Sequence, residues 1–167
     1  MRRTDLSRPS FYVYFRDRHS LVLRVVEHLG SELFTMSDRW LKGTDEGPEL
    51  ARSALDGIVA VYVEHGPVMR ALADAAVDDP GVETAYNALV QTFIDATARH
   101  IEEEIAAGRV LKLSAYETAT ALVWMMERYL TLSLGREPFT PAQTVADTLA
   151  TIWNRVLYAA REGSAGR

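Results

Sequence analysis

"LSRPSFYVYFRDRHSLVL", residues 6–23, places arginines and aromatics directly ahead of an apolar helical pattern. On residue propensity alone its first part could form a strand, but Ser7 is followed two residues later by Pro9. A serine N-cap with a proline in the first turn is a typical helix start. We therefore predict a short helix over about residues 9–14.

Helical periodicity continues along the rest of the chain, and no β-type alternation persists for more than a few residues. Asp17 is expected to cap the next helix, and the Gly66-Pro67 pair is expected to separate two later ones. Short connections without internal repeats favour an all-α helical bundle. Seven helices are predicted, over about residues 9–14, 17–41, 49–64, 68–76, 82–107, 114–134 and 141–160.

The composition fits one folded domain, with 167 residues of which 48% are apolar and 25% charged. No apolar run is long enough to span a membrane and no secretory signal is present, so we expect a cytoplasmic protein without membrane contact. The chain has no cysteine. "HIEEE", residues 100–104, is interpreted as a solvated helix face rather than a metal site, because neighbouring helical residues point apart. We expect no metal, no cofactor and no enzymatic activity, since the known catalytic and nucleotide-binding motifs are missing.

The charge is distributed unevenly along the chain. Residues 1–18 hold five arginines and two aspartates, a local charge of +3, whereas the whole chain carries −5. A basic end on an acidic body suits an element that contacts an anion. Arg8 and Ser10 at a helix start can reach bases or phosphates, and the hydroxyls of Tyr12 and Tyr14 can donate to phosphate oxygens. Ordinary packing is the alternative role for the two tyrosines.

The helix predicted over about residues 115–134 is apolar on more than one face. One side can face the core, and the other needs a partner, most simply a second copy of the chain. We therefore expect a homodimer through this helix and the last one, about residues 141–160. The alternative is a central buried helix in a monomer. The apolar surplus consists of Leu122, Val123, Trp124, Met125, Met126, Tyr129, Leu130, Leu132 and Leu134.

Three segments carry a resemblance to a known family. "LSRPSFYVYFRDRHSLVLRVVE" is similar to the recognition helix and following helix of TetR-family transcriptional repressors. "ETATALVWMMERYL" (Glu117–Leu130) and "LATIWNRVLY" (Leu149–Tyr158) resemble signatures of the EthR-like subgroup of that family. The three segments stand in the right order and the similarity covers nearly the whole chain. A TetR-like all-α fold is the implied architecture.

The resemblance implies two functional parts. A partial helix-turn-helix would occupy residues 1–20, with its recognition helix at 8–14, and a ligand-binding and dimerisation domain would occupy residues 21–162. The helix over about 17–41 would link the two, and residues 163–167 would form a flexible tail. DNA contacts would come from Ser7, Arg8, Ser10, Tyr12, Tyr14 and Arg18.

Family members have two more helices upstream, but only "MRRTD" precedes Leu6 here. A helix of about seven residues does not hold itself together in water without tertiary packing. We therefore favour a start upstream of Met1. The alternative is a truncated relative whose DNA-binding half no longer folds.

The resemblance also implies an elongated, mainly hydrophobic ligand tunnel in the helical body. Val123 and Met126 stand where the subgroup has asparagines, which predicts a more apolar ligand or one bound by fewer hydrogen bonds. Glu127 either pairs with a cation such as Arg128 at a helix surface or is partly buried. An aromatic stripe at helical spacing is also compatible with a plain core. The implied lining is Tyr62, Tyr86, Val90, Phe93, Thr97, Val123, Met126, Glu127 and Trp153.

The leading hypothesis is a ligand-responsive transcriptional repressor. It would bind double-stranded operator DNA as a dimer and be released by a small hydrophobic effector. The alternative is a small-molecule-binding and dimerisation module without DNA activity.

Overall fold

The computed structural model describes residues 8–43 and 47–158, with side chains from residue 20 onward, and within these ranges it is all-helical. The all-α prediction is therefore confirmed for the described chain. The predicted tail and the N-cap Ser7 lie outside the described residues. Five helices make up the fold: α1 (Arg8–Lys42), α2 (Gly47–Asp78), α3 (Pro80–Ala106), α4 (Ala115–Leu134) and α5 (Ala142–Leu157).

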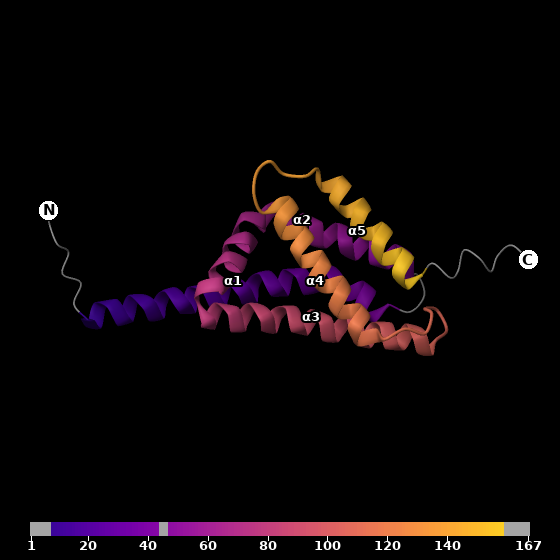
Figure 1. Cartoon of the computed structure of the whole chain (residues 1–167), viewed down its shortest axis with the longest axis horizontal. Helices are drawn as coiled ribbons and strands as arrows, with labels where there is room; N and C mark the ends of the chain where they lie inside the picture. Colours follow the sequence, from indigo (N-terminus) through magenta and orange to yellow (C-terminus); the bar gives the residue numbers. More distant parts are fainter. Residues whose placement is uncertain (1–7, 44–46, 159–167) are drawn as a thin grey trace, which may run out of the picture.

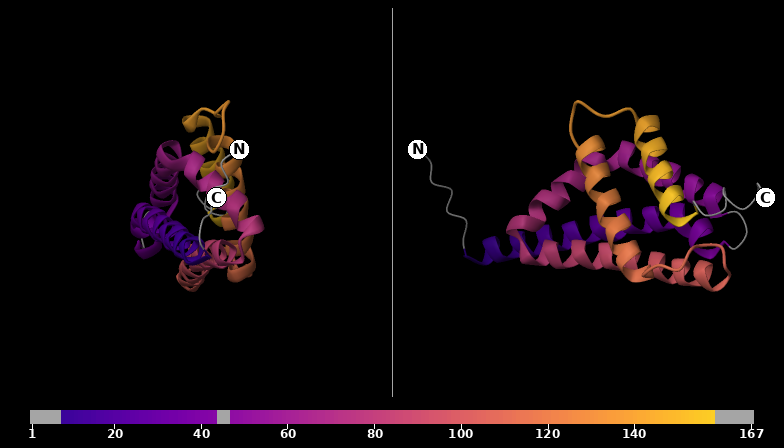
Figure 2. Two further views of the ribbon diagram at one scale, coloured as in Figure 1. Left: turned by 90° about the vertical axis from the view of Figure 1, so that its left-hand side faces the viewer. Right: turned by 45° about the vertical axis from the view of Figure 1, so that its right-hand side comes forward.

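Helices α1 and α3 run side by side along the length of the molecule, and α2 leads from the end of one to the start of the other (Figures 1 and 2). Helix α4 then crosses back over this layer, and α5 packs against α2 and α4. The N-terminal turns of α1 project beyond the rest of the bundle (Figure 1). All five helices contribute to one apolar core.

One correction concerns the N-terminal stretch, where two helices were predicted. Helix α1 is continuous from Arg8 to Lys42, so the separate helix over about 9–14 and the cap at Asp17 are wrong. No glycine or proline stands between Pro9 and Gly30. Once nucleated, a helix extends through such a run, because each added residue gains a hydrogen bond at little cost.

A second correction concerns the Gly66-Pro67 pair. It lies inside α2, which is one helix of 32 residues drawn with a pronounced bend in Figure 1. Proline removes one backbone donor and bends a helix, but it ends the helix only if packing permits. Here the C-terminal end of α4 packs directly on Gly66, where an added Cβ would collide with the carbonyl of Leu134. Seven predicted helices thus become five.

The predicted helix ranges of about 82–107 and 114–134 end close to where α3 and α4 end, at Ala106 and Leu134. Gly108 has a φ of 71°, the left-handed conformation that favours glycine after a helix, and Gly135 is the C-cap of α4. The N-caps of α4 and α5 are Ser114 and Pro141, and neither makes a side-chain cap hydrogen bond.

Candidate functional site

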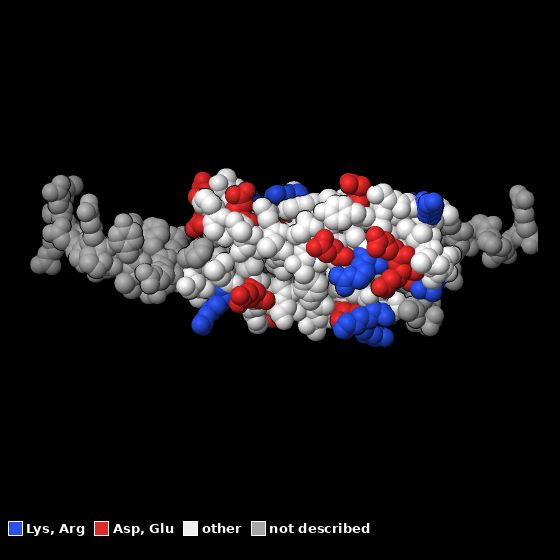
Figure 3. Space-filling view, turned by 90° about the horizontal axis from the view of Figure 1, so that it is seen from below, with Lys and Arg blue, Asp and Glu red and all other residues white. Residues whose placement is uncertain are grey.

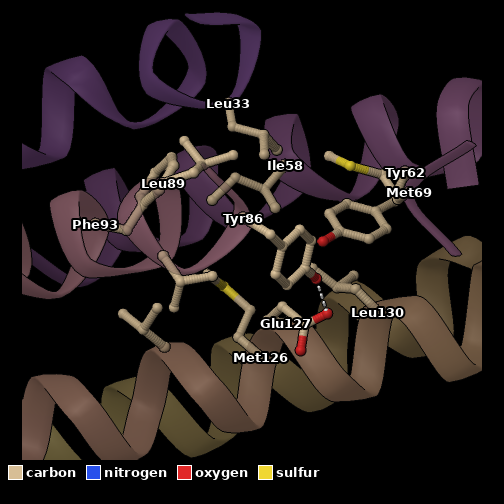
Figure 4. A pocket seen from close by; sticks show the side chains of 12 residues that line it. Leu33, Ile58, Tyr62, Met69, Tyr86, Leu89, Phe93, Met126, Glu127 and Leu130 are labelled. Carbon is tan, nitrogen blue, oxygen red and sulfur yellow. Dashed lines mark hydrogen bonds between the residues drawn. The ribbon is translucent and has the colours of Figure 1, made fainter. Parts of the chain in front are cut away.

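A cavity lies inside the bundle where α2, α3 and α4 meet under α1 (Figure 4). Its wall is almost entirely apolar and aromatic, with one ionisable acid, Glu127. The free volume is about 50 Å³. The lining residues are Leu33, Ile58, Tyr62, Met69, Tyr86, Leu89, Val90, Phe93, Val123, Met126, Glu127 and Leu130.

A second, smaller cavity of about 20 Å³ adjoins the first. The two share four wall residues, Ile58, Phe93, Val123 and Met126, so they form consecutive chambers along one line of the core. The second chamber continues toward the end of α1, where its wall includes Ser37, Trp40, Leu41, Thr97 and Trp153. Together the two chambers form one elongated apolar space.

All nine side chains predicted to line a tunnel are buried against these chambers. Seven of them line the first, and Thr97 and Trp153 line the second. The prediction missed five wall residues of the first chamber. These are aliphatic positions at helical spacing, which in a sequence look the same as ordinary core: Leu33, Ile58, Met69, Leu89 and Leu130.

Glu127 is held by hydrogen bonds at one end of the first chamber. The hydroxyl of Tyr86 donates to its Oε1, and the hydroxyl of Thr131 donates to the same oxygen over 2.9 Å. The residue is only 7% exposed. Its Oε2 finds no hydrogen-bond partner among the described residues, and the nearest cation is the Nε of Arg128 at 3.9 Å. Of the two alternatives left open by the sequence, the structure shows a buried acid bound by hydroxyls.

The two tyrosines beside Glu127 both have a raised pKa and stay protonated. Burial is the main reason that the pKa of Tyr62 lies above its ordinary value, and the negative charge of Glu127 adds to the rise. Burial also raises the pKa of Tyr86, with further contributions from Tyr62 and from the hydrogen bond to Glu127. Figure 4 shows both hydroxyls near the carboxylate. The carboxyl group in the chamber therefore lies among neutral hydroxyls.

Rings from three helices pack together beside the second chamber, whose wall includes Trp40 and Trp153 but not His100. The ring of Trp40 on α1 lies 4.4 Å from that of His100 on α3 and 5.5 Å from that of Trp153 on α5. The Nε1 of Trp40 donates to the hydroxyl of Tyr158 over 3.1 Å. By contrast, His100 Nε2 and Trp153 Nε1 are buried and find no hydrogen-bond partner among the described residues.

The interpretation of residues 100–104 as a solvated face is wrong for two of its members. His100 is 3% exposed and Glu104 is 2% exposed, whereas Glu102 and Glu103 are exposed. Helix α3 turns this edge toward α1 and the chain after α3, where Arg109 donates to both carboxylate oxygens of Glu104. Burial lowers the pKa of His100, against the opposing effect of the neighbouring carboxylates.

The predicted DNA-binding residues fall at the projecting start of α1. Arg8, Ser10, Tyr12, Tyr14 and Arg18 belong to this helix, but their side chains lie outside the described part of the structure, as does Ser7. Figure 3 shows acidic and basic side chains interspersed on the face of the body seen from below. The described part of that face thus offers no continuous basic surface for DNA.

Large apolar side chains remain exposed on α4, α5 and the loop between them. Trp124 is 38% exposed and Leu132 59% exposed on α4, and Val156 on α5 is 43% exposed. Other residues of α4, including Leu122 and Leu130, are buried in the core. Helix α4 therefore has apolar residues on both its buried and its outward side, as the sequence predicted.

Among the described residues, no group of three or more histidines and carboxylates is placed to hold a metal ion. None of the described helices combines the length and apolar character needed to cross a bilayer.

The fold and the two chambers define a class of protein: a helical bundle that encloses an elongated apolar space beneath a long N-terminal helix. A family model described as "Transcriptional regulator EthR, C-terminal domain" matches residues 51–159. The chain belongs to the TetR family of transcriptional regulators, in its EthR-like subgroup.

Similar proteins agree with this assignment. The chain is 31% identical over 159 residues to the HTH-type transcriptional regulator EthR of Mycobacterium tuberculosis strain H37Rv, covering 92% of this chain and 73% of that protein. It is equally similar to the EthR of Mycobacterium bovis. The EthR of Mycolicibacterium smegmatis is 28% identical over 156 residues, covering 92% of this chain and 72% of the relative.

Proposed function

We propose that this regulator is a ligand-responsive repressor, which binds operator DNA as a homodimer and is released by a small hydrophobic effector. The observation that carries the proposal is the pair of apolar chambers. Their wall includes residues of α1, the helix whose N-terminal turns extend beyond the rest of the bundle (Figure 1). The proposal involves no catalytic step and places the protein in the cytoplasm with the DNA.

The wall chemistry supports an effector that is mostly apolar. Aliphatic, aromatic and methionine side chains surround the space, and methionine adapts easily to ligands of different shape. Small-molecule sites commonly hold about 300 Å³ or more. The chambers are far smaller, so an effector has to spread the side chains that separate them, Phe93 and Met126 among these.

Spreading the chambers acts directly on α1. Leu33 on this helix is part of the wall, and the ring of its neighbour Phe34 stacks on Phe93 of α3 with centroids 3.9 Å apart. A ligand that displaces Phe93 therefore disfavours the present position of α1. An effector can shift an equilibrium only through such differential contacts, so this stack links the pocket to the DNA-binding segment.

The outward side of α4 and α5 supports the dimer. Contiguous exposed apolar surface on a soluble protein commonly marks an interface, and a two-fold axis lets one surface serve both copies. Light scattering should therefore give twice the chain mass. Leu132→Asp should shift the population toward monomer, while Leu111→Asp, at a residue of similar exposure (64%) outside α4 and α5, should not. A monomeric wild type would contradict this part of the proposal.

Operator binding is tested by gel retardation with the DNA upstream of the protein's own gene. We expect binding that weakens steeply with salt, since phosphate neutralisation releases counterions. Arg8→Ala and Arg18→Ala should weaken it, whereas Arg70→Ala on the body should not. A dimer that binds apolar ligands but retards no DNA at low salt would instead support the module without DNA activity.

A further inference from the structure

The wall of the two chambers holds an acid but no base. Among the described residues that line them, none is a lysine, an arginine or a histidine, and Glu127 is the only carboxylic acid. The phenols of Tyr62 and Tyr86 stay protonated, because the pKa of each is raised. A ligand that enters this space therefore meets one acidic group and no basic side chain.

The contacts of Glu127 leave its carboxyl group only partly compensated. The hydroxyls of Tyr86 and Thr131 both donate to Oε1, whereas Oε2 finds no hydrogen-bond partner among the described residues. The Nε of Arg128 is 3.9 Å from Oε2, too far for a hydrogen bond, and the Arg128 side chain is 62% exposed. A buried acceptor without a partner is unfavourable, and a buried carboxylate without a close cation is more so. A ligand group that donates hydrogen bonds and carries a positive charge compensates both.

The surroundings of the carboxyl group also suit a cation. Figure 4 shows the rings of Tyr62 and Tyr86 beside Glu127, and Phe93 belongs to the same chamber wall. Aromatic rings attract cations electrostatically, most strongly where water is excluded. Because Glu127 lines the first chamber, a ligand that fills this chamber lies against it.

The second chamber has no acid that competes for a cation. Its Ser37 hydroxyl donates to the carbonyl of Leu33 over 3.0 Å, and the Trp40 N–H donates to Tyr158 over 3.1 Å. Trp153 offers an N–H donor, which an ammonium group cannot use. The second chamber is therefore suited to the apolar part of a ligand.

We propose that Glu127 anchors a positively charged group, and that the effector is an elongated primary amine. The inference rests on the proposed function, because it assigns a chemical class to the ligand of the same pocket. A primary ammonium group has three N–H donors, so it can pair with the carboxyl group and with hydroxyl oxygens at once. The alkyl chain occupies the remaining length of the two chambers. A fatty acid is disfavoured, because it brings a second carboxylate to the same space.

Three ten-carbon ligands test the proposal on the full chain: decylamine, 1-decanol and decanoate. Their dissociation constants are measured by isothermal titration calorimetry at neutral pH, where an alkylamine is protonated as lysine is. We expect decylamine to bind about tenfold more tightly than 1-decanol, since a hydrogen bond to a charged group is roughly twice as strong as a neutral one. Decanoate should bind most weakly. Without an acidic anchor the alcohol would bind best, because an apolar cavity disfavours an ion more than a neutral hydroxyl.

Two substitutions on α4 assign the preference to Glu127. Glu127→Gln keeps the shape of the side chain but removes the acid, so 1-decanol should become the tighter ligand. Glu117→Gln removes an acid from an exposed position of the same helix and should leave the ratio unchanged. The preference for the amine should also persist when the salt concentration is raised, because a buried ion pair is screened much less than adsorption to the surface.

The outcomes separate the anchor from the pocket, and the comparison in wild type holds even if Glu127→Gln fails to fold. If wild type binds 1-decanol as tightly as decylamine, or if Glu127→Gln keeps the preference for the amine, the cationic subsite is wrong while the apolar pocket stands. A preference that disappears in high salt or in Glu117→Gln reflects surface adsorption and overturns the subsite as well. If none of the three ligands binds, the ligand-responsive function itself is wrong.

Discussion

Replacing Tyr86 with phenylalanine removes one hydroxyl from the buried carboxylate of Glu127 and leaves the ring in place. Tyr86 is 8% exposed and Glu127 7% exposed, so water does not readily replace the lost donor. Hydrogen bonds to charged groups contribute about 1.5–3 kcal/mol, compared with about 0.5–1.5 kcal/mol for neutral pairs. Because Thr131 still donates to Oε1, we expect Tyr86→Phe to lower the free energy of unfolding by about 2 kcal/mol.

The assay is urea denaturation of four proteins: wild type, Tyr86→Phe, Glu127→Gln and the double variant. In the glutamine background Tyr86 donates to a neutral amide oxygen, so its removal should cost only about 1 kcal/mol. The difference, a coupling of about 1 kcal/mol, measures the charge assistance between the two side chains. The slope of the transition should stay constant, which shows that the variants share one unfolded state.

Tyr116→Phe is the matched control, since this tyrosine on α4 is 48% exposed and its hydroxyl only accepts from Gln91. Its effect should stay within about 0.5 kcal/mol, as for most surface substitutions. A loss below about 0.5 kcal/mol in Tyr86→Phe would refute the reasoning, because it would match that surface range. Equal losses in the glutamate and glutamine backgrounds would refute the charge-assisted part alone.

Three other changes test separate parts of the core. Because burial lowers the pKa of His100 below the ordinary 6.5, the unfolded chain takes up this proton first on acidification. The contribution of His100 to the free energy of unfolding should therefore be fully present above pH 6.5 and decrease below it, by at most about 1.4 kcal/mol per pH unit. In urea denaturation between pH 7.5 and 5.5, the free energy of unfolding of His100→Leu should depend less on pH than that of the wild type. Gly66→Ala should lose about 3 kcal/mol or more in urea denaturation, because the new Cβ meets the backbone carbonyl of Leu134, whereas an unchanged midpoint would mean that the two helices separate freely. Arg109→Met should cost about 3 kcal/mol by leaving the carboxylate of Glu104 buried without its partner, and adding Glu104→Gln should restore part of the loss in the same assay.

The sequence predicted best what depends on local chemistry. Gly108 and Gly135 end their helices where expected, because the left-handed or capping backbone that follows a helix is favoured by residues adjacent in sequence. The continuity of α2 through Pro67 could not be predicted in this way. Whether a proline ends or only bends a helix depends on the packing around it, and here that packing comes from Leu134, far away in sequence.

The residues of the candidate site also differ in how far the sequence could predict them. Its aromatic and acidic members, such as Tyr86 and Glu127, could be assigned from a resemblance because they occupy distinctive positions. Leu33 and Leu130 could not, because an aliphatic residue in a cavity wall has the same spacing as one in a filled core. His100 was misassigned for a different reason: it stands in a charged run, and it is buried by packing against Trp40 of α1, which lies far away in sequence.

The continuity of α1 matters for how a pocket could control DNA binding. If α1 were two helices, a displacement at the pocket could be absorbed at the joint between them. Instead one helix runs from Arg8 past Leu33, a residue of the chamber wall. Packed interiors transmit strain because they contain little free volume, and an unbroken helix moves largely as a unit. Under the proposed function, moving Phe34 off its stack on Phe93 would shift the projecting turns of α1 together with the wall, and effector and operator would then compete for the position of this one helix.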